Sequence, residues 1–128
     1  MFGGELSALI FCVAITVTDG ESLRCDTPRG WNDVPLRIRA LHAPAAGEPG
    51  DVAAAAALQA LARPPLVCAV VAEDARGRLV VDCVLSDGRD LAASMIRTGT
   101  AAHCPALGRP DLSLIDQPDL GPLPPECD

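Results

Sequence analysis

Short apolar runs separated by glycine-containing turns restrict this chain to a small, mainly β fold. The runs have strand length and are rich in aliphatic and β-branched residues. Asp19-Gly20 follows the first run, and Asp-Gly is a strong signal for a tight hairpin. We therefore predict five strands, over residues 10–17, 22–25, 36–41, 66–72 and 79–85.

Two other segments have helical features. Residues 52–62 follow Asp51, a good capping residue, and precede a Pro-Pro pair that stops a helix. A second helix is predicted to begin after Asp90 and to end at Gly99. The expected buried stripe of the first helix consists of Val52, Ala55, Leu58 and Leu61.

The order of these elements places a helix between the third and fourth strands. That order predicts an α+β domain, mainly β with two or three helices, built as a five-stranded Greek-key barrel of the OB type. A chain of 128 residues is long enough for one such domain with a core of its own. Residues 1–104 are expected to form the barrel. Residues 105–128, which contain six prolines, are expected to form an irregular surface tail anchored by Cys127.

Cysteine usage indicates disulfides. None of the six cysteines has the Cys-x-x-Cys spacing typical of zinc or thioredoxin-like sites, so we expect disulfides and an oxidising location, secreted or periplasmic. Cys68 and Cys83 lie symmetrically about the turn 73–78, so a hairpin places them face to face and we predict that they pair. The other four cysteines allow three connectivities, which the sequence does not rank.

The apolar segment Leu6–Ile15 has two interpretations. Its length suits the core of a signal peptide, but Glu5 is acidic and no Lys or Arg precedes it, so we favour a buried first strand. A cytoplasmic location therefore stays open. The segment is too short to span a bilayer, which needs about 20 apolar residues. We expect a monomer that does not insert into membranes.

The basic residues suggest a local phosphate site. A net charge of −7 opposes long-range attraction of nucleic acid, and the scarcity of aromatic residues disfavours a base-stacking surface. Arg37 and Arg39 alternate with apolar residues on one predicted strand, and Arg78 lies in a turn. Guanidinium groups bind phosphate oxygens bidentately, which makes these arginines candidate ligands. In the alternative interpretation the strand arginines are only the polar face of the strand, and Arg78 pairs with Asp74 or Glu73.

Three stretches, taken in order, resemble one enzyme family. Residues 17–23 read V-T-D-G-E-S-L against a family pattern V-x-D-G-D-T-[LVI], residues 37–45 read R-I-R-A-L-H-A-P-A against R-[LV]-x-x-[IV]-D-[AT]-P-E, and residues 74–79 read D-A-R-G-R-L against D-[RK]-Y-G-R-x. With the helix between them, they make the chain from about Val13 to Ala102 similar to the staphylococcal nuclease, or thermonuclease-like, family.

The resemblance implies a function and a set of site residues. Members of that family hydrolyse phosphodiesters of DNA and RNA with the help of calcium. By position, Arg37 and Arg78 would clamp the phosphate. Glu21 would be a calcium ligand, and Asp19 is a less favoured one.

Two positions depart from the family pattern. His42 stands where the family has a second acidic ligand, and Ala45 stands where it has the glutamate that activates water. Because calcium prefers oxygen ligands to imidazole, we expect it to bind weakly or not at all. Glu48 and His42 are the remaining candidates for a base.

We therefore expect a nuclease-like domain with impaired or lost catalysis. Two alternatives stay open. One is a non-catalytic module that binds single-stranded nucleic acid or a nucleotide phosphate. The other is a disulfide-stapled structural or protein-interaction domain.

Overall fold

A computed structural model describes residues 8–128 of the chain. The strands are β1 (Leu9–Cys12), β2 (Ala14–Asp19), β3 (Ser22–Asp26), β4 (Val34–Ile38), β5 (Leu41–His42), β6 (Leu66–Glu73), β7 (Leu79–Val84) and β8 (Ala102–His103). The α-helices are α1 (Asp51–Leu61) and α2 (Leu91–Arg97). They are followed by the 3₁₀ helices η2 (Pro105–Leu107), η3 (Pro110–Leu114) and η4 (Pro125–Cys127).

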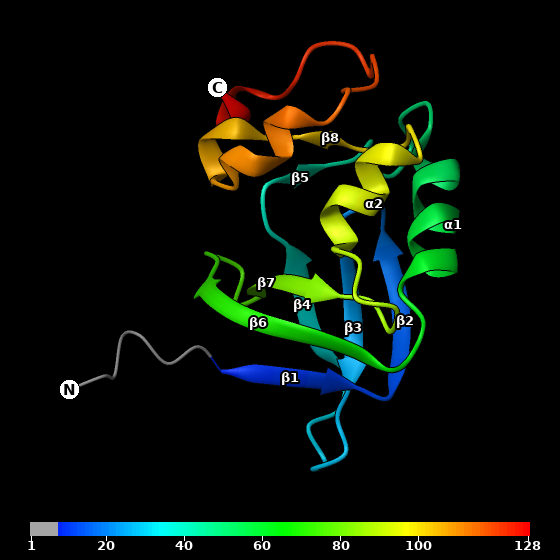
Figure 1. Ribbon diagram of the computed structural model, residues 1–128, viewed down its shortest axis with the longest axis vertical. Coiled ribbons are helices and arrows are strands. Elements are labelled where there is room, and N and C mark those ends of the chain that lie inside the picture. Colours follow the sequence, from blue (N-terminus) through cyan, green and yellow to red (C-terminus); the bar gives the residue numbers. More distant parts are fainter. Residues whose placement is uncertain (1–7) are drawn as a thin grey trace, which may run out of the picture.

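The main sheet is mixed and strongly curled. Its strand order is β1-β6-β7-β4-β3-β2, and all neighbours are antiparallel except β4 and β7, which are parallel. The two outermost strands follow one another in the chain, so the sheet curls into a barrel-like shape (Figure 1). The N–H of Val13 donates to the carbonyl of Asp26 at 2.9 Å, which links the bend between β1 and β2 to β3. The prediction of a mainly β, barrel-like α+β domain is confirmed at this level.

Two of the predicted strands are divided. The first, expected near 10–17, is interrupted at Val13, and the part of the apolar segment that precedes residue 8 lies outside the described residues. The third, expected over 36–41, ends at Ile38 because Ala40 adopts a left-handed conformation with φ +61°. Leu41 and His42 then turn away to pair with β8. This bend carries His42 out of the main sheet.

The predicted buried stripe of α1 is wrong at its first position. Val52 is 77% exposed, and the buried residues of the helix are Ala54 and Leu58. A helix made largely of alanine has faces of similar hydropathy, so the neighbouring elements decide which face is buried. Here that neighbour is the β2–β3 turn, where a Cβ built on Gly20 lies 2.6 Å from the Cβ of Ala54.

The two helix caps differ from one another. Asp51 is the first helical residue rather than the cap of α1, because the capping position is Gly50 with φ +92°. At α2 the prediction is confirmed: the N–H of Ala93 donates to Oδ2 of Asp90 at 2.9 Å. Almost all of α2 is buried, so this short helix closes one end of the core.

Three disulfides join the described cysteines. Cys68 and Cys83 are directly opposite in the β6–β7 ladder and are bonded, as predicted. The pairings that the sequence left open are Cys12–Cys25, which joins β1 to β3, and Cys104–Cys127. Three disulfides fit an oxidising, extracellular type of environment.

The C-terminal tail is tied to the barrel by an ion-pair network. The side chain of Arg109, 11% exposed, has nitrogens 3.3 Å from Asp82, 3.2 Å from Asp90 and 2.8 Å from Asp111. Arg39, for which the sequence left open a phosphate-binding role or a place on the polar face of its strand, joins this network through a 2.6 Å contact with Asp82. Among the described residues, no helix has the length and apolar character needed to cross a membrane.

Candidate functional site

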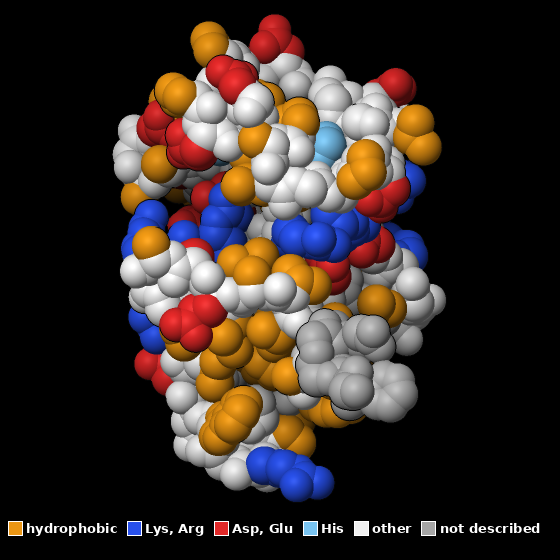
Figure 2. Space-filling model, turned by 90° about the vertical axis from the view of Figure 1, so that its left-hand side faces the viewer, with side chains coloured by type: hydrophobic (Ala, Val, Ile, Leu, Met, Phe, Trp, Pro, Cys, Tyr) orange, Lys and Arg blue, Asp and Glu red, His pale blue; other side chains and the backbone are white. Residues whose placement is uncertain are grey.

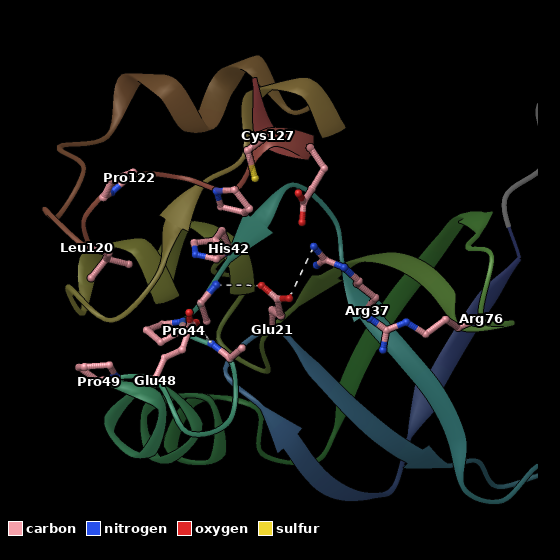
Figure 3. Close-up of a pocket in the computed structure, with 14 residues that line it drawn as sticks. Glu21, Arg37, His42, Pro44, Glu48, Pro49, Arg76, Leu120, Pro122 and Cys127 are labelled. Atoms are coloured by element: carbon pink, nitrogen blue, oxygen red, sulfur yellow. Dashed lines mark hydrogen bonds and ion pairs between the residues drawn. The ribbon is translucent and has the colours of Figure 1, made fainter.

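A pocket of about 560 Å³ lies where the β2–β3 turn, the end of β4, β5 and the C-terminal tail meet (Figure 3). It contains most of the residues that the sequence singled out. The lining consists of Glu21, Arg37, His42, Ala43, Pro44, Ala45, Glu48, Pro49, Arg76, Leu120, Pro122, Pro124, Glu126 and Cys127.

Glu21 is fixed in this pocket by the turn that carries it. Oδ1 of Asp19 accepts the N–H of Glu21 at 2.9 Å and the hydroxyl of Ser22 at 2.7 Å, so the acidic turn is held by its own side chain. Oε2 of Glu21 then accepts the N–H of Ala43 at 2.8 Å. Burial raises the pKa of Glu21, and the nearby positive charge of Arg37 only partly opposes that rise.

Part of the Arg37 guanidinium already makes hydrogen bonds within the protein. Its side chain is 15% exposed, and Nη1 donates to the carbonyls of Ile38 and Leu41 at 3.0 and 3.1 Å. Nη2 lies 3.7 Å from Oε1 of Glu21, which is an ion-pair distance and not a hydrogen bond. These two carbonyls orient the guanidinium and leave its Nη2 and Nε atoms for an anion.

The second arginine of the pocket is Arg76. Among the described residues, the lining includes Arg76 and not Arg78. Nε of Arg78 donates to Oδ2 of Asp74 at 2.7 Å, the pairing described by the alternative interpretation of the sequence. Desolvation alone would raise the pKa of Asp74, but hydrogen bonds from Arg78 and Arg76 outweigh it and lower that pKa. The side chain of Arg76 is exposed.

The two candidate bases, Glu48 and His42, also line the pocket, but they differ in their contacts. Oε1 of Glu48 accepts the N–H of Ala45 at 2.6 Å, so this carboxylate stabilises its own loop. The imidazole of His42 lines the pocket and extends toward the C-terminal tail near Cys127 (Figure 3). Asp19, the less favoured metal candidate, is not a lining residue and holds the turn instead.

The residues present do not fit calcium. A calcium site needs six to eight oxygen ligands, several of them carboxylates. Here Glu21 already accepts a backbone N–H, position 42 offers a nitrogen, and position 45 offers a methyl group. Among residues 8–128 there is no group of three or more His, Cys, Asp or Glu side chains arranged to hold a metal ion.

The sequence did not predict that the tail contributes to the pocket. One wall of the pocket consists of Leu120, Pro122, Pro124 and Glu126. With Glu126, three carboxylates share the pocket with the guanidinium groups of Arg37 and Arg76. A signal was present in Cys127, which had to pair with some part of the barrel, but its partner could not be identified from spacing. Figure 2 shows one face of the molecule, on which arginine side chains lie beside acidic side chains.

Comparison of the sequence with protein-family models finds no matching family, and comparison with curated proteins finds no matching relative.

Proposed function

We propose that this chain is a secreted or periplasmic, nuclease-like OB barrel that binds the phosphate of single-stranded nucleic acid or of a nucleotide and has little or no hydrolytic activity. The observation that carries the proposal is the meeting of Arg37 and Arg76 with Glu21 in one pocket. Two guanidinium groups in a hollow of this size suit a phosphate diester.

The same pocket lacks the groups that fast hydrolysis needs. Attack on a diester needs a base for the water and a positive charge on the phosphate oxygens, and each contributes several kcal/mol. Glu48 is engaged with the backbone of its own loop, and the donor set does not suit calcium. Binding without turnover is therefore the function that these residues support best.

Affinity is expected to be modest and local. The carboxylates of Glu21, Glu48 and Glu126 offset the two arginines, and the net charge of −7 gives no long-range attraction. The ligand is therefore held by contacts to one or two phosphates and not by an extended basic surface.

A second candidate is a disulfide-stapled structural domain. It is favoured by the hydrogen bonds of Arg37 to the carbonyls of Ile38 and Leu41, which give this arginine a role in holding the β4–β5 bend. In that case phosphate affinity would not depend on the pocket arginines.

The test is a titration of a labelled single-stranded oligonucleotide in calcium or in chelator, followed by anisotropy for binding and by gel electrophoresis for cleavage. We expect calcium-independent binding without cleavage above background. Arg76→Ala should weaken binding about tenfold, the value of one charge-assisted contact.

The matched control is Arg97→Ala. Arg97 is also exposed but lies outside the pocket, so its removal changes the net charge equally and should leave the affinity almost unchanged. Equal losses in the two variants would indicate non-specific attraction and contradict the proposal. Rapid, chelator-sensitive cleavage by the wild type would contradict it in the other direction.

A further inference from the structure

The last part of the tail, residues 117–128, is attached to the rest of the domain at its two ends. At one end, Oε1 of Gln117 accepts the N–H of His103 at 2.7 Å, and Nε2 of Gln117 donates to the carbonyls of Leu112 and Ile115. At the other end, the Cys104–Cys127 disulfide fixes η4 beside η2.

Between these anchors the segment has only local hydrogen bonds. Within residues 118–128, the N–H of Gly121 donates to the side chain of Asp119, and the other hydrogen bonds join η4 to the residues that flank it. Packing and the disulfide therefore hold this stretch against the pocket. Without the disulfide, ordering this stretch against the pocket would cost more conformational entropy, because the disulfide restricts the segment before it packs.

This same stretch forms one wall of the phosphate pocket. Leu120, Pro122 and Pro124 narrow it, and Glu126 adds a carboxylate to the cavity that contains Arg37 and Arg76. A carboxylate in the same cavity repels a phosphate by its charge. The wall therefore acts against the ligand that the arginines favour.

We propose that residues 119–128, held by the Cys104–Cys127 disulfide, are an inhibitory wall that lowers the affinity of the Arg37–Arg76 pocket for phosphate esters. The proposal rests on the proposed phosphate-binding function. It predicts that a chain with the wall released binds a phosphate diester more tightly than the wild type does.

The experiment compares variants that release the wall in different ways. The first is Cys104→Ser with Cys127→Ser, which keeps the segment but frees its end, and the second is Cys104→Ser with the chain ended after Pro118. The third is Glu126→Gln, which leaves the disulfide intact and removes only the charge. Asp116→Asn is the matched control, because Asp116 is an exposed carboxylate next to the segment but outside this pocket.

The ligand is the thymidine dinucleotide TpT, whose single diester charge does not change with pH near neutrality. We expect roughly tenfold tighter binding in the two released variants, comparable to one added charge-assisted contact. Glu126→Gln should improve binding about two- to fivefold, the range for a single partly solvated charge. Asp116→Asn should bind as the wild type does.

A second readout does not depend on phosphate binding. Diethyl pyrocarbonate acylates accessible imidazoles, and the chain has two histidines, His42 on the pocket wall and His103, which is buried. Release of the wall should accelerate acylation of His42, measured by peptide mass spectrometry, while His103 stays protected. An unchanged rate at His42 overturns the proposal whatever happens to affinity.

The outcomes separate the two proposals. If His42 reacts faster but the released variants bind TpT no more tightly than the wild type does, the segment is a cover without an inhibitory role, and this inference is overturned. If none of the variants binds TpT at all, the phosphate-binding function fails as well. Should the disulfide variants lose their fold, Glu126→Gln still decides, since an affinity equal to that of Asp116→Asn contradicts the inhibitory wall.

Discussion

Oε1 of Glu21 lies 3.7 Å from Nη2 of Arg37, so the acidic and basic groups of the pocket are paired in charge without sharing a hydrogen bond. The other carboxylate oxygen of Glu21 is occupied by the N–H of Ala43. The charge state of Glu21 therefore determines how much positive potential Arg37 presents to a ligand.

Affinity for TpT should increase as the pH falls. Because burial raises the pKa of Glu21, its carboxylate becomes neutral at a higher pH than an exposed glutamate does, and Arg37 then no longer faces the negative charge of Glu21. We expect about two- to fivefold tighter binding at pH 5 than at pH 8, measured by calorimetry.

The other titratable groups that face this site are His42, Glu48 and Glu126, so the pH effect needs controls. Glu21→Gln keeps an oxygen for the N–H of Ala43 and should bind TpT more tightly than the wild type does at pH 8, with a smaller change in affinity between pH 8 and pH 5. His42→Gln removes the imidazole from the pocket and should retain most of the effect. Full pH dependence in Glu21→Gln would show that Glu21 is not its source.

The salt dependence of oligonucleotide binding should be shallow. A single strand gives a slope of about −0.7 per neutralised phosphate in a plot of log affinity against log salt concentration, so two arginine contacts predict a slope of roughly −1.4. Arg76→Ala should reduce this to about −0.7, and Arg97→Ala should not change it. A wild-type slope several times steeper would indicate an extended basic groove in place of a local pocket.

The sequence predicted where some side chains of this candidate pocket lie and missed others, whose position depends on contacts between distant parts of the chain. Alternation in residues 36–41 correctly placed Arg37 on the polar side of a buried strand, and the Asp-Gly turn placed Glu21. The pairing of Arg78 with Asp74 was one of two interpretations of the sequence, but the place of Arg76 in the pocket was not predicted, because only the folded turn shows which arginine faces the pocket. The tail wall depends on a disulfide whose partners are far apart in the chain, so no local pattern encodes it.

Gly20→Ala should destabilise the fold by about 1–3 kcal/mol, the usual cost of overpacking. A Cβ at this position would lie 2.6 Å from the Cβ atoms of both Ala43 and Ala54, so the β2–β3 turn cannot keep its present distance from α1 and from the residue that follows β5. Chemical denaturation would measure the loss. The double variant Gly20→Ala with Ala54→Gly should lose less stability than the sum of the losses in the two single variants, because one of the clashing methyl groups is gone. Strict additivity would mean that this close approach is not what constrains position 20.

Arg109→Met should lower the free energy of unfolding by about 2 kcal/mol, since it removes a largely buried cation from Asp90 and Asp111 and leaves Asp82 paired with Arg39 alone. The matched control is Arg89→Met, which breaks an exposed pair with Asp87 and should change stability little.

Arg109→Met should also change how the free energy of unfolding depends on pH in the acidic range. A hydrogen bond from Arg109 lowers the pKa of Asp111 below its usual value, so the stability from this pair is present above the pKa of the unfolded chain and is lost as the pH falls through the folded-state pKa. Urea denaturation at pH 7 and at pH 3 should therefore show a smaller difference for Arg109→Met than for the wild type. An equal difference in both proteins would mean that Asp111 and its arginine do not contribute to acid sensitivity, and that other carboxylates cause it.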